Sequence, residues 1–293
     1  EKPDGVVVYG DTNSTIAGAL AAAKIYIPVI HIEAGLRSFN KAMPEELNRI
    51  SCDHMSTLLF TPTETGLTNL SNEGFKLDHT PKATIDSPNV YHCGDIMYDN
   101  SLHFSKVADQ FSSVMDEQNL KANEFVLMTV HRDTNTDIAE NLEAIFSAVD
   151  QLSKENEITF VLPLHPRTKS KMESQLSDDL YKRVLESELI KVIDPVGFMD
   201  IIVLEKNARM VVTDSGGLQK ESFFFEKPCV ILREQTEWTE IVDNGNAILT
   251  GANHSKIIEA FNALYKKDDY TYPTFYGDGK AAEFICSKII DEI

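Results

Sequence analysis

The feature that most constrains the fold is one pattern repeated along the whole chain: a short apolar run, a few polar or small residues, and then a longer stretch with helical periodicity. The runs are rich in valine and isoleucine and are apolar at both alternating positions, which is typical of parallel strands covered on both faces by helices. Strands that alternate with helices imply crossover connections, so the sequence predicts an α/β protein with doubly wound sheets. The runs are residues 5–9, 28–32, 57–61, 90–93, 125–130, 158–164, 190–193, 210–213, 228–232 and 247–249.

A division into two domains is expected from the chain length and from one seam. A length of 293 residues is typical of a protein with two domains. A helical segment over residues 100–118 leads into polar residues and a fresh strand. We predict a Rossmann-like domain over residues 1–105 and a second over residues 106–275, the two facing a cleft. A C-terminal helix within residues 276–293 is expected to cross back to the first domain.

The charge balance restricts the partners. There are 27 basic and 46 acidic side chains, which give a net charge of -19. This field repels DNA and anionic membranes, so we expect neither nucleic acid nor a membrane as partner. The most apolar stretch, residues 15–30, is broken by Lys24 and Pro28 and is too short to span a bilayer, and the chain does not start with a signal peptide.

The cysteines favour a reducing compartment. None of the four belongs to a Cys-x-x-Cys pair, so neither a zinc site nor a disulfide framework is expected. We therefore predict a cytoplasmic protein with reduced thiols. The four are Cys52, Cys93, Cys229 and Cys286.

Polar side chains gather directly after the apolar runs, where open parallel sheets bind their ligands. Asp11, Glu33 and Glu45 supply carboxylates to the first domain. Any one such residue can be a helix cap or a turn residue. For Glu46, in a helix start with Pro44, the helix dipole explains the acid. Glu33 directly follows a buried strand, where a carboxylate usually has a task.

The turn Asp214-Ser215-Gly216-Gly217 follows the run at residues 210–213 and opens a helix. Its small residues let backbone amides approach an anion, and the helix amino end adds unpaired N–H groups and positive dipole. The turn therefore predicts a diphosphate-binding site, in which Glu221 accepts hydrogen bonds from ribose hydroxyls. The alternative is a tight strand-to-helix turn in which Glu221 only faces the dipole.

Basic residues end three further strands of the second domain. His131 and Arg132 suit phosphate chemistry, because an imidazole can donate a proton while a guanidinium holds charge; a satisfied buried histidine is the alternative for His131. His165 and Arg167 form a second basic tip, whose alternative role is to anchor the loop. Arg233 ends the run at residues 228–232.

From about residue 3 to the end, the chain resembles the non-hydrolysing UDP-N-acetylglucosamine 2-epimerases. That resemblance implies a glycosyltransferase-B-like pair of domains, with the nucleotide held mainly by the second. The motifs that carry it are Gly10-Asp11-Thr12, His31-Ile32-Glu33-Ala34-Gly35-Leu36-Arg37, Pro44-Glu45-Glu46-Leu47-Asn48-Arg49, Pro62-Thr63-Glu64-Thr65, His131-Arg132 and Asp214-Ser215-Gly216-Gly217.

The resemblance also implies a reaction, anti elimination of UDP to a 2-acetamidoglycal followed by re-addition, without nicotinamide, metal or other cofactor. Inversion of C2 needs acid–base groups on both faces of the ring. By motif position the catalytic residues are Asp11, Glu33, Glu45 and His131. The expected contacts to the UDP-amino sugar come from Arg37, His165, Arg167, Ser215, Gly216, Gly217, Glu221 and Arg233. Relatives commonly form homodimers and supply precursors of cell-surface polysaccharides.

The chain departs from the family pattern in places. Thr134 stands where the family commonly has glutamate, and Lys220 replaces a common acidic residue. Other segments look more like the branch acting on modified sugars such as UDP-2,3-diacetamido-uronates, and the parent and modified substrates both stay open. The Gly-Thr-Arg-Pro-Glu strand that begins family members is not in this sequence, so the first domain is expected to be incomplete and the isolated chain weakly active or inactive.

Two other functions fit the same motifs. A UDP-sugar glycosyltransferase of this architecture also uses a phosphate turn followed by a ribose-binding glutamate, although three carboxylates argue against it. A non-catalytic UDP-sugar-binding fragment is favoured by Thr134 and opposed by intact Asp11, Glu33, Glu45 and His131.

Overall fold

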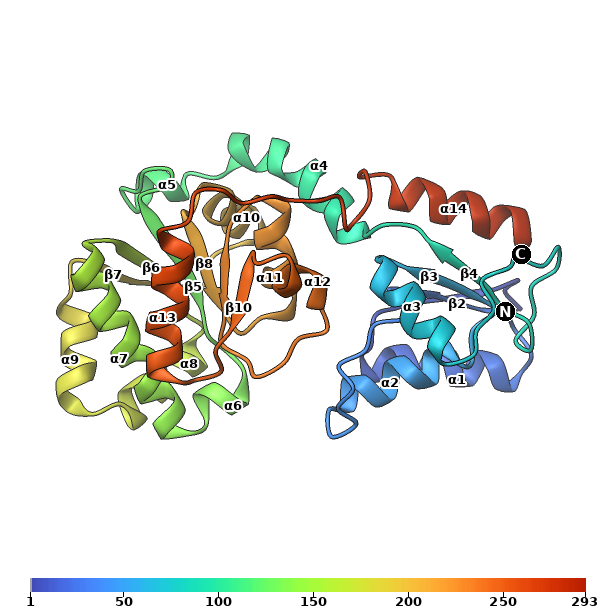
Figure 1. Cartoon of the computed structure of the whole chain (residues 1–293), viewed down its shortest axis with the longest axis horizontal. Helices are drawn as coiled ribbons and strands as arrows, with labels where there is room; N and C mark the ends of the chain where they lie inside the picture. Colours follow the sequence, from blue (N-terminus) through green and yellow to red (C-terminus); the bar gives the residue numbers. More distant parts are fainter. Residues whose placement is uncertain (1) are drawn as a thin grey trace. The chain divides into compact units, whose positions relative to one another are not determined.

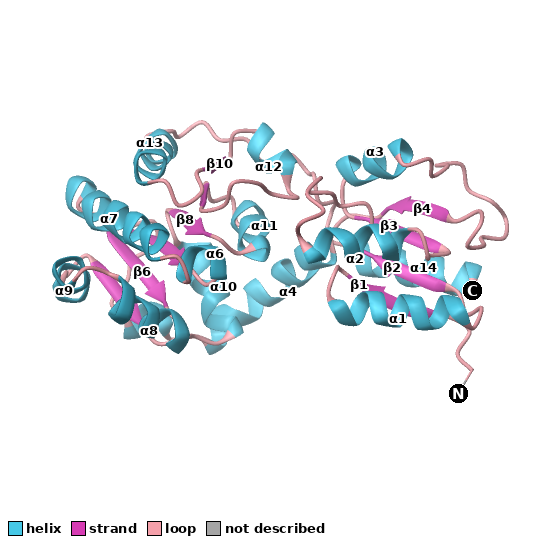
Figure 2. Ribbon diagram, turned by 90° about the horizontal axis from the view of Figure 1, so that it is seen from below, coloured by secondary structure: helices cyan, strands magenta, loops and turns pink. Residues whose placement is uncertain are grey.

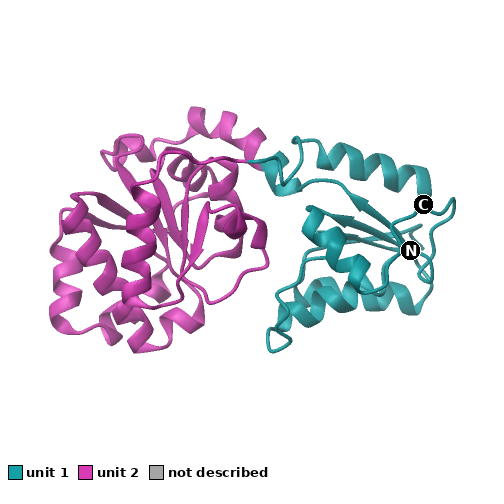
Figure 3. Ribbon diagram, in the orientation of Figure 1, with its two compact units in different colours: residues 1–100, 273–293 teal, residues 101–272 magenta. Residues whose placement is uncertain are grey.

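A computed structural model describes residues 2–293 and divides the chain into two compact units (Figure 3). Unit 1 consists of residues 1–100 and 273–293, and unit 2 of residues 101–272. The first boundary falls inside helix α4 (Ile96–Phe111). Within the described part of the chain, no helix is both long enough and apolar enough to span a membrane.

Unit 1 is a four-stranded parallel sheet in the order β1-β2-β3-β4, with helices on both faces (Figure 1). Successive strand residues face opposite sides. Val29 packs with α1 and α2, whereas Ile30 packs with the C-terminal helix α14, as expected for a strand buried on both faces. The strands are β1 (Val6–Tyr9), β2 (Val29–Ile32), β3 (Leu58–Thr61) and β4 (Asn89–His92), and the helices are α1 (Asn13–Lys24), α2 (Pro44–Asp53), α3 (Glu64–Asn72) and α14 (Ala281–Glu292).

Unit 2 is a six-stranded parallel sheet in the order β10-β9-β8-β5-β6-β7. One large apolar cluster joins one face of this sheet to α7, α8, α9 and α13, and α11 packs on β8 and β9. Figure 2 shows the same layers from a second direction. The strands are β5 (Phe125–Thr129), β6 (Thr159–Pro163), β7 (Ile190–Ile193), β8 (Met210–Thr213), β9 (Cys229–Ile231) and β10 (Ala247–Leu249).

The helices of unit 2 separate these strands along the chain, as crossover connections require. They are α5 (Val114–Glu117), α6 (Asp133–Thr136), α7 (Ala139–Asn156), α8 (Pro166–Gln175), α9 (Asp178–Glu186), α10 (Phe198–Asn207), α11 (Gly216–Phe224), α12 (Thr239–Asp243) and α13 (His254–Tyr265).

The predicted fold class is confirmed, because each of the predicted apolar runs overlaps one of the strands β1–β10 and both sheets are parallel. The predicted C-terminal helix is α14, whose Ile285 packs against the sheet of unit 1. The positions of these short strands could be predicted because each strand is apolar on both faces and is bounded by polar residues. In each sheet the loops after the strands collect at one edge, which positions the candidate site residues.

Candidate active site

Two candidate carboxylates follow neighbouring strands of unit 1. Strands β1 and β2 end in register, with Tyr9 opposite Ile32, so Asp11 and Glu33 both lie just past the carboxyl edge of the sheet. The backbone turns sharply after each of these strands: Gly10 has a φ of 65° and Glu33 a φ of 71°. A left-handed conformation is uncommon for a residue with a side chain and often marks a functional position.

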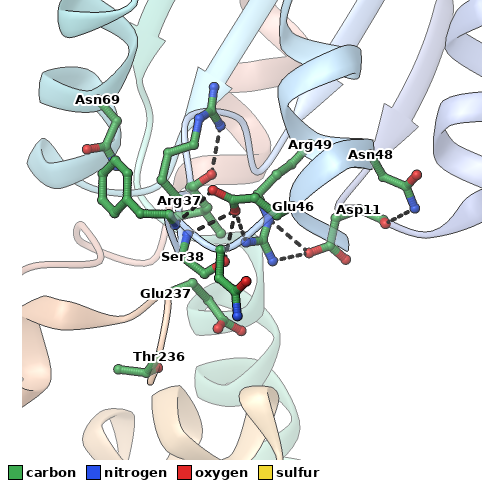
Figure 4. Close-up of polar contacts among 12 residues, drawn as sticks. Asp11, Arg37, Ser38, Glu46, Asn48, Arg49, Asn69, Thr236 and Glu237 are labelled. Atoms are coloured by element: carbon green, nitrogen blue, oxygen red, sulfur yellow. Dashed lines mark hydrogen bonds and ion pairs between the residues drawn. The ribbon is translucent and has the colours of Figure 1, made fainter. Parts of the chain in front are cut away.

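Asp11 is held by helix α2. The Arg49 guanidinium contacts Asp11 Oδ2 through Nη2 at 2.6 Å and through Nε at 3.2 Å, and the Asn48 amide donates to the Asp11 carbonyl at 2.8 Å (Figure 4). The Asp11 side chain is 28% exposed, and both contacts to Arg49 use the same oxygen. Asp11 Oδ1 takes no part in these contacts to Arg49.

Glu45 and Glu46 open helix α2, as predicted, but they have different surroundings. Glu45 is half-buried in the first turn. Glu46 is buried and accepts hydrogen bonds from the Ser38 and Phe39 amides, both at 2.9 Å, and from Arg49 Nη1 at 2.7 Å. Burial alone would raise the pKa of Glu46, but these donors hold it below its ordinary value. Glu46 thus fastens the loop after β2, a role beyond the expected one of facing the helix dipole.

Four charged groups of unit 1 form a network, in which His31, Arg37 and Asp53 are buried and Glu73 is partly exposed. His31 Nδ1 contacts Asp53 Oδ1 at 2.7 Å, and Arg37 Nη2 contacts Asp53 Oδ2 at 2.8 Å. Arg37 Nε also contacts Glu73 Oε1 at 2.6 Å. Arg37 is 2% exposed, so its guanidinium is engaged with carboxylates of its own unit. Sequence reasoning missed Asp53, because nothing in the spacing of 22 residues from His31 indicates a contact.

In unit 2, His131 and Asp214 meet at the carboxyl ends of β5 and β8. These strands pair in register, with Thr129 opposite Thr213. His131 Nδ1 lies 2.9 Å from Asp214 Oδ1, and the imidazole is 55% exposed. A carboxylate can only accept, so Nδ1 carries the proton and Nε2 is the nitrogen available to a ligand. His131 is thus not the buried, fully satisfied histidine of the alternative reading.

Sequence reasoning named Asp214 as part of a motif but assigned it no role of its own. It is fully buried and accepts from the backbone amides of His131 and Arg132 and from the Asn135 side chain, at 3.0–3.1 Å. Burial would raise its pKa, but His131 and these donors hold the pKa below its ordinary value. Asp214 therefore fixes both the imidazole and the loop that carries it.

The turn after β8 opens helix α11 as predicted. Ser215 is the N-cap residue, and its hydroxyl accepts from the Leu218 amide. The first N–H groups of a helix have no acceptor inside the helix. Since Ser215 caps Leu218, the amides of Gly216 and Gly217 are the ones offered to an anion. Glu221 lies one turn further along and is half-buried.

Side-chain contacts join α11 to the loop between β9 and α12. Arg233 is buried and contacts Glu237 Oε2 at 3.1 Å, and Glu237 Oε1 lies only 3.0 Å from where a Cβ on Gly216 would stand. Thr236 donates to the Gln219 side chain at 2.6 Å. The Arg233 charge is thereby held beside the start of α11.

His165 and Arg167, the basic residues after β6, are exposed, and Arg167 pairs with acidic side chains. His165 caps α8. The Arg167 guanidinium contacts Asp133 Oδ1 at 2.5 Å and Asp137 Oδ2 at 2.8 Å, and these carboxylates raise its pKa. Arg167 therefore anchors the His131 loop to α8 and still has solvent access. In the described part of the chain, no group of three or more His, Cys, Asp and Glu side chains is placed to hold a metal ion.

Comparisons with known proteins place the chain in a family. The family model described as UDP-N-acetylglucosamine 2-epimerase matches residues 1–290. A UDP-N-acetylglucosamine 2-epimerase homolog of Methanococcus maripaludis is 44% identical over 96% of this chain and 74% of its own. The UDP-2,3-diacetamido-2,3-dideoxy-D-glucuronate 2-epimerase of Pseudomonas aeruginosa is 43% identical over 99% of this chain and 75% of its own. The structure of Methanocaldococcus jannaschii UDP-GlcNAc 2-epimerase with UDP-GlcNAc and UDP superposes with a TM-score of 0.85 at 37% identity, covering 99% and 76% of the two chains.

Proposed function

The chain belongs to the UDP-N-acetylglucosamine 2-epimerase family, and from this premise we propose how its residues carry out a non-hydrolysing 2-epimerisation. The enzyme is an isomerase acting on a UDP-linked N-acetylamino sugar. Asp11, Glu33 and Glu45 of unit 1 handle the proton at C2, and His131 of unit 2 assists the diphosphate.

The reaction has two balanced halves. A carboxylate removes the C2 proton while the bond from C1 to the diphosphate oxygen breaks, which gives a 2-acetamidoglycal and UDP. A carboxylic acid then returns a proton to C2 on the opposite face, and the diphosphate oxygen adds back to C1. The C2 proton has no adjacent carbonyl and is barely acidic, so positive charge must develop at C1 as it leaves. Several carboxylates close to the sugar stabilise that charge.

The observation that carries the proposal is the His131–Asp214 pair at the sheet edge that also bears the amino end of α11. The bond from Nδ1 to Asp214 leaves Nε2 available to a ligand, at the sheet edge where the Gly216 and Gly217 amides begin α11. An imidazole so held can give a proton to the departing diphosphate and take it back on re-addition.

The UDP contacts that we propose are the amides of Gly216 and Gly217, the Ser215 cap, Glu221 on the ribose, and charges from Arg233, His165 and Arg167. Relatives solved with UDP-GlcNAc or UDP support a nucleotide site in this fold. For Arg37 the contacts described above favour a different role: it braces the loop after β2 and does not itself bind UDP.

The substrate is the parent UDP-N-acetylglucosamine or a modified UDP-amino sugar; relatives of comparable identity are named for either kind. We propose a homodimer that works in the cytoplasm, where sugar nucleotides for cell-surface polysaccharides are made. The net charge of -19 supports a small-molecule substrate over a nucleic acid or an anionic membrane.

Proton NMR in heavy water tests the function. The protein is used at its full natural length and is incubated with UDP-N-acetylglucosamine and, separately, with UDP-2,3-diacetamido-uronate, without any acceptor. We expect deuterium at C2 and a mixture of C2 epimers. The M. jannaschii relative serves as the positive control, and calorimetry with UDP reports binding independently of turnover.

Two results would point elsewhere. Transfer of the sugar to an added acceptor, without deuterium at C2, would identify a glycosyltransferase. UDP binding with no exchange on any UDP-amino sugar would identify a non-catalytic binding protein. Exchange in the Asp11→Asn, Glu33→Gln and Glu45→Gln variants at the wild-type rate would remove the proposed roles of these carboxylates.

A further inference from the structure

The histidine of strand β2 has an environment that determines its charge. His31 is fully buried. Its Nδ1 lies 2.7 Å from Asp53 Oδ1 and its Nε2 lies 2.9 Å from the Gly10 carbonyl oxygen. A carbonyl oxygen only accepts hydrogen bonds, so Nε2 must carry a proton. The remaining question is whether Nδ1 carries one too.

The surroundings of Asp53 answer that question. Its second oxygen, Oδ2, accepts from Arg37 Nη2 at 2.8 Å and from the Gly35 amide at 3.2 Å. Burial would raise the pKa of Asp53, but His31 and Arg37 hold it below its ordinary value. Asp53 is therefore an ionised acceptor at both oxygens. A neutral imidazole would leave one ring nitrogen facing an oxygen without a proton between them.

Charge balance leads to the same protonation state. The network consists of His31, Arg37, Asp53 and Glu73, with Cys52 beside it on α2 and Glu33 on the loop that follows β2. With His31 doubly protonated, two cations face two anions. With His31 neutral, Asp53 and the partly exposed Glu73 would face Arg37 alone, and the network would carry a net negative charge.

We propose that His31 is a permanently charged imidazolium and acts as a positioning residue for the two catalytic carboxylates that follow β1 and β2. It holds the Gly10 carbonyl, and therefore the turn that presents Asp11. It also places a positive charge beside Glu33, whose Oε1 lies 3.4 Å from the position that a Cβ on Gly10 would take. This inference rests on the proposed roles of Asp11 and Glu33.

The pKa of His31 agrees with this assignment. Burial alone would lower it, but the hydrogen bond and charge of Asp53, the Gly10 carbonyl and the charge of Glu33 raise it above the ordinary value. Stability that comes from such a group is present at low pH and is lost only as the pH rises through the raised pKa.

The protonation state can be measured without any turnover. Nitrogen-15 NMR of the histidine side chains at about pH 8, well above the ordinary histidine pKa of about 6.5, should show both ring nitrogens of His31 protonated. The His31→Gln variant assigns the signal. A pattern of one protonated and one bare nitrogen would overturn the proposal. This arm holds even if the protein has no epimerase activity.

The positioning role is tested by kinetics. His31→Gln should lower kcat by roughly 100-fold, the size of effect that misplacement by about 1 Å can have, and should leave the calorimetric Kd for UDP within about 2-fold. His79→Gln is the matched control, because His79 also hydrogen-bonds a carbonyl of unit 1, that of Val90. A wild-type kcat in His31→Gln would refute positioning. If that variant does not fold, the NMR result on the wild type decides.

Discussion

The two candidate half-sites are stabilised in different ways. In unit 1 the edge that bears Asp11 and Glu33 is held by charged side chains, because His31, Asp53, Arg37 and Glu46 are buried and bonded to one another or to the loops. In unit 2 the edge that bears His131 and Ser215 is held by the buried carboxylate of Asp214, by a helix cap and by the exposed contacts of Arg167, beside a large apolar cluster.

The difference matches the chemistry assigned to each unit. Proton transfer at carbon needs carboxylates in fixed positions close to other charges, and a buried ion network can hold them there. A diphosphate instead needs backbone amides, a helix amino end and a few cations. Three apolar clusters among the described residues of unit 1 are each smaller than the large cluster of unit 2, so we expect the loops of unit 1 to depend more on the ion network. The comparison predicts that removing one buried charge affects unit 1 most.

The largest effect is expected for Asp53→Asn. The change leaves His31 and Arg37 buried without their shared counter-ion, and breaking a buried pair costs about 3–5 kcal/mol. Denaturant unfolding should show that loss in unit 1. The control is Glu64→Gln, which removes an exposed partner of His92 and should change the unfolding free energy by less than about 1 kcal/mol. Equal stability of the two variants would contradict the comparison.

Asp214→Asn should affect catalysis next most strongly. An amide can no longer accept from Nδ1 and from two backbone amides at once, so the His131 imidazole loses its orientation. We expect kcat for C2 exchange to fall by at least about 100-fold. Asp179→Asn removes an exposed partner of Arg183 on α9 and serves as the control. Exchange at the wild-type rate in Asp214→Asn would show that the pair does not position the acid.

A smaller, pH-dependent effect is expected at Glu205 in unit 2. This side chain is fully buried on α10, and neither oxygen has a hydrogen-bond partner. Burial, and then the charge of Glu221, raises its pKa well above 4.5. The folded state therefore keeps a proton that the unfolded state has released, and stability falls as the pH rises above about 4.5.

The slope for one proton is about 1.4 kcal/mol per pH unit, until the pH reaches the raised pKa. Glu205→Gln keeps the shape and removes the titration. The stability of the variant relative to the wild type should thus increase with pH above 4.5. Parallel pH profiles of the two proteins would mean that Glu205 is not a protonated acid.

The smallest change in stability is expected for Arg167→Gln. Its contacts with Asp133 and Asp137 are exposed and screened by salt, so the denaturation midpoint should not move measurably. If Arg167 contributes charge to the diphosphate, the Kd for UDP rises several-fold at low salt and less at high salt. An unchanged Kd at low salt would leave Arg167 with its anchoring role alone.

Sequence reasoning located the strands, and with them the loops that carry the candidate site residues, for a physical reason. Strands such as β5 and β8 are apolar on both faces and end at polar residues, so local composition marks them. Asp53 and Glu73 were missed because their partner Arg37 is distant in sequence and nothing local signals the contact. The role of Asp214 was missed because a carboxylate before a cap serine looks like part of the turn. Burial, which separates a scaffold charge from a ligand contact, appears only in the fold.

In the proposed mechanism, carboxylates act on the sugar and a helix amino end binds UDP. Calorimetric titration of UDP into the Glu45→Gln and Gly216→Ala variants tests that division most directly. A methyl group on Gly216 would stand 3.0 Å from Glu237 Oε1 at the start of α11. The account predicts that Gly216→Ala weakens UDP binding by at least about 10-fold, or about 1.4 kcal/mol, while Glu45→Gln keeps the wild-type Kd. Wild-type UDP affinity in Gly216→Ala together with lost affinity in Glu45→Gln would contradict it.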